Sequence, residues 1–590
     1  MRLRFSSLVS VSVFLMLSSA ACELFDPNQW KATDGTSVEP AKPEPVLAYS
    51  DAGDAAGQGV WAADTGTVAS VAYLRGNQNM AVGGYGLVIG LDGGGSSTCP
   101  QSVAEYLRKE IRRTQLGASP TVSHAISPDD LIKSPHTAAV MVMGEIPAAA
   151  LKGRRFDVFV RAVDQDVKSL AGGTLLPCDL RLLSTGMRPD PEGRLLGRAA
   201  GRVFTNPFSR DGDTTSDSDP REGRVLGGGC STNEDRRVAL NPVSPSYSIV
   251  REVARSINNR FGPTHKSADP LSPSSVKLSV PPQYEGRESE FLELATHIPL
   301  ATGREMIELR AKALSDDLAR PEAPYERTSL CLEAIGPSAI PFVRKHYTHR
   351  QRATSYFAAR VGGRLGDDLA IEVLRQHAEE RDGSYRQPAI EELGRIEVAP
   401  AMVTSALRGL LEDDDPRIRI AAYESLRRRD DPVVQSYRVG EENFVLDVVA
   451  SKGSGLIYAR RTGERRIVLI GSSIRCRPPL FYSGTDRPVT LSANGDAEKI
   501  TLVRRFDDGR RISDPVQVSL DVSELVRVLG ADLAPGGSGG LGADYGLVLD
   551  ILSEFCQSGA ILAQFRLEQT SVTDLLGPIE PMVRPETDEL

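Results

Sequence analysis

Few side chains in this sequence have the types and spacing that chemistry requires. Four aspartates lie close together in residues 209–220, at positions 211, 213, 217 and 219. Carboxylate oxygens are the ligands that calcium prefers, but the segment does not meet the EF-hand pattern, which requires glycine at its sixth and glutamate at its twelfth position. We therefore expect a solvated loop, with a calcium site as the alternative.

The seven histidines give no metal-binding pattern, because none lies in an HExxH sequence. His346 and His349 have no acidic residue near them in the sequence, so a surface pair on a helix is the expected arrangement. The glycines at 84, 86 and 90 resemble a dinucleotide loop, but the last is one position too far along. We predict no catalytic, cofactor-binding or metal-binding residue, no cofactor, and no enzymatic activity.

Cys22 is the residue most suited to a covalent modification. Arg2 and Arg4 precede an apolar run that is too short for a permanent membrane span and ends in small residues, a pattern typical of an export signal over residues 1–21. A cysteine at the cut site resembles the bacterial lipobox, although Ser19 stands where leucine is usual. We predict lipidation of Cys22; the alternative is an ordinary signal peptide with a chance cysteine.

Composition narrows the class of protein further. The chain has 590 residues, with 69 basic and 78 acidic side chains and a formal net charge of −9, so nucleic acid is not an expected partner. Six cysteines follow Cys22 without a zinc pattern. An exported location permits disulfides between them, whereas buried thiols are the alternative, most of all for Cys331 in a helical stretch.

The pattern of apolar residues predicts a multi-domain α+β chain. Residues 22–67 are rich in proline and small residues and predict a flexible spacer, and a mixed helix-and-sheet body follows over residues 68–315. Strands are expected at 138–143 and 156–160, with a helix that starts at a capping box of Ser102 and Glu105 and another over 250–261.

The sequence predicts a series of consecutive helices over residues 316–440. Arg386, Ala389 and Leu393 recur as Arg419, Ala422 and Leu426, a shift of 33 positions, and residues 352–374 are a candidate degraded copy. We expect a HEAT-like repeat inserted with its own core, with an unrelated helical bundle as the alternative.

A second body segment over 441–568 contains an expected hairpin around residues 461–464, helices near 522–529 and 547–555, and a last strand at 561–565. An acidic tail follows over 569–590.

Four runs in the first body segment resemble the bacterial flagellar P-ring protein family, in the order in which that family has them. They are VGGYGLVIGLDG at 82–93, AAVMV at 138–142, KSLAGGTLL at 168–176 and ARSINNRFG at 254–262. Residues 525–529, 550–552 and 559–564 are similar to the family's closing segment. The resemblance covers about 68–315 and 445–568, with the helical repeats between them.

The resemblance implies a structural protein and a ring-subunit fold. Members of that family assemble as many copies into a ring around the flagellar rod, within the peptidoglycan layer, and support motility. The implied partners are further copies of the chain, the rod, the L-ring protein, peptidoglycan and, through Cys22, the outer membrane. The implied location is the periplasm and the flagellar basal body. Gly84, Gly86, Gly90, Gly172 and Gly173 are expected to be structural glycines. The alternative is an outer-membrane-tethered envelope scaffold without a flagellar role.

Overall fold

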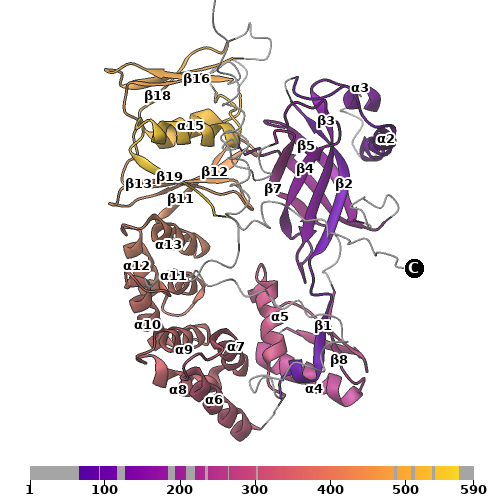
Figure 1. Cartoon of the computed structure of the whole chain (residues 1–590), viewed down its shortest axis with the longest axis vertical. Helices are drawn as coiled ribbons and strands as arrows, with labels where there is room; N and C mark the ends of the chain where they lie inside the picture. The colour runs from indigo at the N-terminus through magenta and orange to yellow at the C-terminus, as the bar shows by residue number, and fades with distance from the viewer. Residues whose placement is uncertain are drawn as a thin grey trace, which may run out of the picture. The chain divides into compact units, whose positions relative to one another are not determined.

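The computed structural model describes residues 66–569 (Figure 1). Within that range the description leaves out residues 92, 116–126, 184–192, 207–218, 233–236, 263–264, 301–302, 484–487, 506–511 and 534–538. The predicted export signal, Cys22, nearly all of the predicted spacer and all but the first residue of the predicted acidic tail therefore lie outside the described residues. Among the helices of the described residues, none is both long and apolar enough to cross a membrane.

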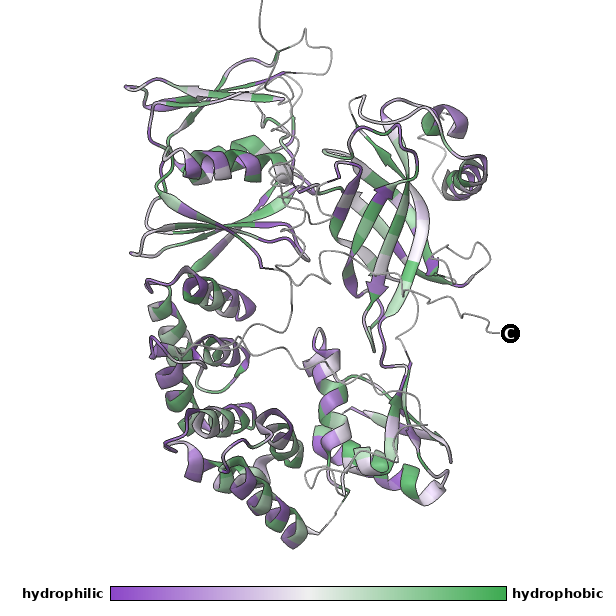
Figure 2. Cartoon of the chain, viewed as in Figure 1, coloured by the Kyte–Doolittle hydropathy of each residue, from purple (hydrophilic) through white to green (hydrophobic). Residues whose placement is uncertain are grey.

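A closed antiparallel barrel forms the first part of the described chain. Its strands follow one another in the order β2 (Met80–Ile89), β3 (Thr137–Ile146), β4 (Arg155–Ala162), β7 (Glu222–Ser231), β6 (Leu195–Arg202) and β5 (Thr174–Leu182). Figure 2 shows apolar residues on these strands. Successive side chains of a strand point to opposite faces, so Val140 and Val142 of β3 enter the barrel core, whereas Ala139 belongs to an apolar cluster outside it. The strands predicted at 138–143 and 156–160 are confirmed as β3 and β4.

Two helices, α2 (Gln101–Gln115) and α3 (Pro128–Ile132), pack on the outside of the barrel, where Val103, Leu107 and Ile132 join one apolar cluster with strand residues. The predicted capping box is wrong, because α2 begins at Gln101 and Ser102 therefore lies within its first turn. The Glu105 side chain instead accepts a hydrogen bond from the side-chain amide Nε2 of Gln101.

A second, four-stranded sheet has the order β1 (Ala72–Arg75), β8 (Val238–Pro242), β10 (Ser275–Leu278) and β9 (Ala268–Ser272). Its core includes residues of α4 (Tyr247–Phe261) and α5 (Glu288–His297). Helix α4 confirms the predicted helix, and Val250, Val253 and Ile257 on its inner face are fully buried. The 3-10 helices η1 (Val68–Ser70) and η4 (Pro282–Tyr284) belong to the same part of the chain.

Consecutive helices then follow from residue 304 to residue 428. They are α6 (Arg304–Leu318), α7 (Tyr325–Ile335), η5 (Pro337–Ala339), α8 (Ile340–Val343), η6 (Arg344–His346), α9 (Arg352–Arg364), α10 (Asp368–Glu379), α11 (Arg386–Arg395), α12 (Pro400–Leu410) and α13 (Pro416–Arg428).

The 33-residue repeat has a direct structural reason. Nε of Arg386 donates a hydrogen bond to the carbonyl of Ala378, at 3.0 Å, and Nε of Arg419 donates to the carbonyl of Leu411, at 2.9 Å. Each arginine thus satisfies a carbonyl eight residues earlier, at or just after the end of the preceding helix. Ala353 stands 33 positions before Arg386, so the candidate earlier copy lacks this arginine although it folds as α9 and part of α10.

The last part of the described chain is a layer of helices between two sheets (Figure 1). One sheet has the order β11 (Val434–Val439), β12 (Phe444–Val449), β14 (Arg466–Ile470), β13 (Gly455–Ala459) and β19 (Ala563–Leu567). The other has the order β15 (Leu480–Tyr482), β16 (Val489–Ala493), β17 (Lys499–Arg504) and β18 (Val516–Ser519). Helices α14 (Val522–Gly530) and α15 (Tyr545–Gln557) share one apolar core with both sheets. The hairpin of β13 and β14 and both helices confirm the sequence prediction, and the last strand lies two residues later than expected.

The expectation that the helical repeats have a core of their own is wrong. The apolar cluster of helices α6 to α13 continues into the five-stranded sheet, where Val449, Leu456, Val468 and Ile470 belong to it. The hydroxyl of Tyr423 in α13 also donates to the buried Asp447 of β12, at 2.5 Å. The helices and this sheet therefore fold as one packed unit.

Candidate functional site

Two of the predicted structural glycines lie in β2, where neighbouring strands leave no room for a side chain. A Cβ atom at Gly84 would lie 2.2 Å from the carbonyl oxygen of Asp179, and one at Gly86 would lie 2.7 Å from Leu175. Neither glycine has a positive φ. Close approach of the chain, rather than backbone freedom, is thus the reason for glycine at both positions.

The other three predicted glycines lie in turns at the barrel rim. Gly90 and Gly172 have φ angles of 78° and 72°, a region that other residues rarely adopt. Gly173, the neighbour of Gly172, is required for lack of space rather than for its φ angle, because a Cβ atom there would lie 2.4 Å from the side chain of Val88. The five positions therefore have two separate physical constraints.

A buried carboxylate ties the barrel wall to its outer helix. Asp179 of β5 is 5% exposed and forms ion pairs with Arg113 of α2, with Arg198 of β6 at 3.0 Å, and with Arg181 at 3.8 Å. The hydrogen bond from Arg113 to this carboxylate raises the pKa of the guanidinium. A buried charge with several partners fixes the relative position of the elements that carry them.

Asp157 of β4 joins parts of the chain that lie about 300 residues apart in sequence. Its Oδ1 accepts hydrogen bonds from the backbone N–H of Gly227, at 2.6 Å, and of Gly463 in the β13–β14 turn, at 3.0 Å. Glu568 accepts from the two preceding N–H groups of that turn, at Arg461 and Thr462. Sequence reasoning missed both carboxylates, since nothing in the local pattern separates them from other surface acids.

The remaining candidates from the sequence form no metal centre in the described residues, where no group of three or more histidine, cysteine, aspartate or glutamate side chains could hold an ion. The six described cysteines form no disulfide with one another, and burial raises the pKa of Cys178 to about 12 and that of Cys331 to about 11. The ring centroids of His346 and His349 lie 6.0 Å apart. His346 is only partly exposed, and its partial burial lowers its pKa.

Most of the aspartate-rich segment lies outside the described residues. At its end, Asp219 pairs with Arg221, at 2.6 Å. Counted from Asp211, Glu222 falls at the twelfth position, but Ser216 stands at the sixth, where the EF-hand loop requires glycine. Glu222 belongs to β7 and pairs with Arg161 at 2.5 Å.

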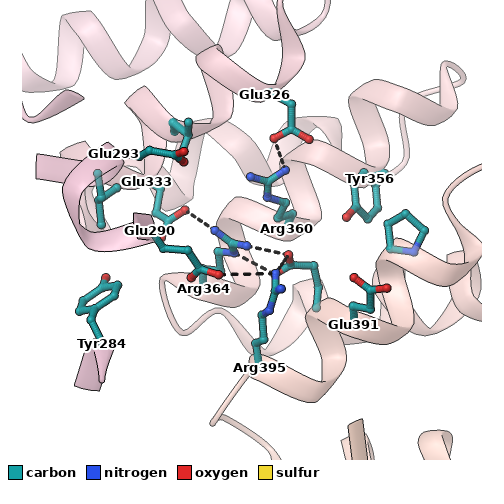
Figure 3. Close-up of a pocket in the computed structure, with 14 residues that line it drawn as sticks. Tyr284, Glu290, Glu293, Glu326, Glu333, Tyr356, Arg360, Arg364, Glu391 and Arg395 are labelled. Atoms are coloured by element: carbon teal, nitrogen blue, oxygen red, sulfur yellow. Dashed lines mark hydrogen bonds and ion pairs between the residues drawn. The ribbon is translucent and has the colours of Figure 1, made fainter. Parts of the chain in front are cut away.

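One highly charged cavity is lined by residues of α5, α7, α9 and α11 and has a volume of about 300 Å³ (Figure 3). Its charged lining consists of six glutamates and three arginines, namely Glu290, Glu293, Glu326, Glu333, Glu391, Glu392, Arg360, Arg364 and Arg395. The lining thus has a formal charge of −3. None of these residues was singled out from the sequence, because they belong to four separate helices.

Arg364 is the centre of this cluster. It forms a bidentate pair with Glu392, at 2.6 and 2.8 Å, and a further ion pair with Glu333, at 3.1 Å. Burial opposes the charge on Glu392, but the hydrogen bonds from Arg364 outweigh it and lower the pKa of that carboxyl. The same partners keep the pKa of Arg364 well above its usual value despite its burial. All three arginines are ion-paired within the cavity.

Two segments of the chain match models of known protein families. Residues 67–307 match the family model described as flagellar P-ring protein, and residues 379–437 match the model of HEAT repeats. The flagellar P-ring protein of Geobacter sulfurreducens is 33% identical over 234 residues, which are 38% of this chain and 57% of that relative. The corresponding protein of Rhodopseudomonas palustris is 30% identical over 253 residues, 40% of this chain and 60% of that protein.

The chain thus spans less than two thirds of the length of these relatives. Among solved structures, a chain in the complex of CpcE and CpcF of phycocyanin lyase from Nostoc is similar. The matched region is 21% of this chain and 80% of that chain, with 20% identity and a TM-score of 0.19.

The segment that contains the barrel and the four-stranded sheet of β1, β8, β10 and β9 is therefore similar to flagellar P-ring proteins, in a mixed α+β chain that also has a helical repeat region. More specifically, the resemblance to flagellar P-ring proteins is confirmed over residues 67–307, and the HEAT-like repeat is confirmed over 379–437. The family match does not reach residues 445–568, where the resemblance stays a prediction.

Proposed function

We propose that this chain is a structural subunit of the flagellar P ring, which assembles in the periplasm around the rod and supports motility. The match of residues 67–307 to flagellar P-ring proteins carries the proposal. The closed barrel suits this role, because it leaves no open strand edge that would pair at random. Head-to-tail contacts between identical subunits close into a ring when the rotation between them closes.

The partners in this proposal are further copies of the chain, the rod, the L-ring protein and peptidoglycan, and the role is structural rather than enzymatic. Lipidation of Cys22 would add an anchor in the outer membrane. In this proposal residues 1–21 are the signal, 22–67 the spacer, 68–315 and 441–568 the two segments of the ring body, 316–440 the repeat region and 569–590 the tail. The names of the relatives, together with the order of the four matching runs, support it.

Deletion of the gene, followed by electron cryotomography of basal bodies, tests this function. We expect the P-ring density and swimming to be lost and both to return when a tagged copy of the gene is expressed. In the restored cells the tag is expected in the ring. Intact P rings and normal swimming in the deletion strain would refute the proposal and favour an envelope scaffold without a flagellar role.

A further inference from the structure

A groove lies where the repeat helices α11 and α13 meet β13 and β19 of the five-stranded sheet. Helix α13 lies between α11 and that sheet (Figure 1). The groove has a volume of about 790 Å³, which is within the usual range for binding sites. Gln569, the last described residue of the chain, belongs to its lining. Residues 570–590 therefore begin at this groove.

The helical wall and the sheet wall of the groove each contribute one arginine that lacks a carboxylate partner. Arg428 of α13 and Arg566 of β19 are accessible to solvent, and neither forms an ion pair with a described residue. The other two arginines of the lining, Arg417 and Arg460, each pair with a carboxylate. Glu391 is the one carboxylate of the described lining outside such pairs. Two unpaired cations thus stand against one unpaired anion.

The surroundings of Arg428 also favour an added carboxylate. Partial burial lowers the pKa of Arg428, and the guanidinium groups of Arg395 and Arg427 lower it further, against the carboxylates of Glu424 and Glu391. Like charges nearby disfavour the charged form of a group, and an opposite charge favours it. An acidic segment therefore suits the groove better than a basic one.

The segment that begins at the groove has this character. Residues 570–590 contain five acidic residues, at 574, 580, 586, 588 and 589, and one basic residue, at 584, for a formal charge of −4. Near its start, two acidic residues flank three apolar ones, in the order Asp574, Leu575, Leu576, Ile579 and Glu580. The groove offers partly exposed apolar side chains of Ile420 and Leu567. Charge and apolar character thus complement each other.

We propose that residues 570–583 bind in this groove of the same chain. Asp574 and Glu580 pair with Arg428 and Arg566, and the apolar residues between the two carboxylates cover the apolar part of the groove. The segment after the last strand thereby binds the repeat helices and the sheet together. This contact goes beyond the ring function, because it depends only on the groove and on this segment.

Direct attachment favours binding within one chain over binding between two chains. Asp574 follows Gln569 by five positions, so the two residues lie at most ~18 Å apart. A tethered segment has a high effective concentration at a nearby site, so a contact of modest affinity is enough to hold it.

A fluorescein-labelled peptide with the sequence of residues 570–590 tests the contact by fluorescence anisotropy. The purified full chain is compared with a shortened chain that ends at Gln569. We expect the peptide to bind the shortened chain at least about tenfold more tightly, because the segment already occupies the groove in the full chain. A scrambled peptide of the same composition should bind neither. Equal binding of the peptide to both chains, or none to the shortened chain, would overturn the proposal.

Sedimentation of both chains over a series of concentrations distinguishes a segment of the same chain from one of a second copy. We expect the full and the shortened chain to have the same association state at each concentration. An association of the full chain that the shortened chain lacks would assign the groove to the segment of a neighbouring copy and refute binding within one chain.

Charge reversal tests the named residues. In the shortened chain, Arg428→Glu and Arg566→Glu are each expected to weaken peptide binding about tenfold. Lys312→Glu, an equal change of charge at an exposed position in α6 outside the groove, is the matched control and should bind as the parent does. Thermal unfolding identifies any variant that does not fold. A peptide with Asp574→Lys and Glu580→Lys needs no folding and should bind at least about tenfold more weakly; unchanged binding of this peptide would contradict the proposed pairs.

Discussion

At the scale of single residues, the barrel depends on positions where any side chain is excluded. Gly84 lies directly against the carbonyl of Asp179, a residue whose carboxylate forms ion pairs with three arginines. The glycine and the aspartate thus belong to one crowded part of the wall. The tight fit explains why the run at 82–93 contains several glycines within a strand, where glycine is otherwise unfavourable.

Gly84→Ala is expected to destabilise the protein by about 1–3 kcal/mol, the usual cost of overpacking, because the new methyl group meets backbone rather than a mobile side chain. The midpoint of urea unfolding, followed by circular dichroism, measures the change. Gly495→Ala is the control, since a Cβ atom there meets nothing within 4 Å. Equal midpoints for the two variants would contradict the structural role of Gly84.

Cys22 is the position at which we expect a covalent lipid. Cells that express the Cys22→Ala variant should incorporate no radiolabelled fatty acid into this protein, because the thiol that accepts the lipid is absent. Cys99→Ala, which changes a thiol in the described part of the chain, should retain the label. Label that persists in Cys22→Ala would exclude lipidation at this residue.

At the scale of elements, arginines and aspartates fix the ends of the repeat helices. Arg419 in α13 donates to the carbonyl of Leu411 and, across the boundary to the sheet, to the carbonyls of Ser454 and Ile470. The repeat pattern in the sequence is thus a pattern of capped helix ends as well as of buried apolar residues.

Arg419→Met is expected to destabilise the protein by about 1.5–3 kcal/mol, the range for a hydrogen bond that involves a charged group, because the carbonyls lose their donor. Arg417→Met is the matched control in the same helix, since Arg417 is exposed and pairs only locally, with Asp415. Urea unfolding measures both variants. A control variant that is destabilised as much as Arg419→Met would show that the loss is unrelated to these carbonyls.

Asp367 at the start of α10 gives the repeat region a predictable dependence on pH. Burial opposes its charge, but hydrogen bonds from Arg344, Tyr347 and the backbone N–H of Leu369 outweigh the burial and lower its pKa. The pKa is lower in the folded state than in the unfolded state. The resulting stability is therefore present above the unfolded pKa, near ~3.9, and is lost as the pH falls through the folded pKa.

Asp367→Asn should lower the free energy of unfolding at pH 7 by about 1–3 kcal/mol. It should also reduce the loss of stability of the parent below pH ~4. Urea unfolding at a series of pH values measures both effects, and Asp368→Asn, at the exposed neighbouring position, should behave as the parent does. A parent and an Asp367→Asn variant with parallel pH curves would contradict this role.

At the scale of the whole molecule, the repeat helices and the five-stranded sheet depend on each other. The buried pair of Arg466 and Asp447 lies where α13 meets the sheet, and Tyr423 donates to the same carboxylate. An inserted segment with a separate core could be removed without effect on the rest, but here apolar strand residues face the helices.

Deletion of residues 320–430 is therefore expected to expose Val449, Leu456, Val468 and Ile470, raise the fluorescence of the dye ANS and speed proteolysis within residues 440–569. A second deletion variant in which these four residues are replaced by serine or threonine should bind less dye. A deletion variant as resistant to protease as the parent would mean that the sheet is stable without the helices.

Many of the helices and strands could be predicted from the sequence, because the spacing of apolar residues and the turn-forming residues determine local structure over only a few positions. Helix α4, the hairpin of β13 and β14, and the arginine repeat all follow from such patterns. The start of α2 differs from the predicted capping box, because Gln101 is not a typical residue for a helix start and the polar residues after it match a capping box by chance.

By itself, the sequence determined the fold class, the resemblance of residues 67–307 to flagellar P-ring proteins and the presence of the repeat, since each depends on residues close together in the chain. Only the tertiary structure decided that Asp157 binds the turn at Gly463, that the repeats share a core with a sheet, and that carboxylates from three helices line one cavity. These contacts join residues tens to hundreds of positions apart. Which carboxylate meets which partner depends on how the elements pack, and no local pattern encodes it.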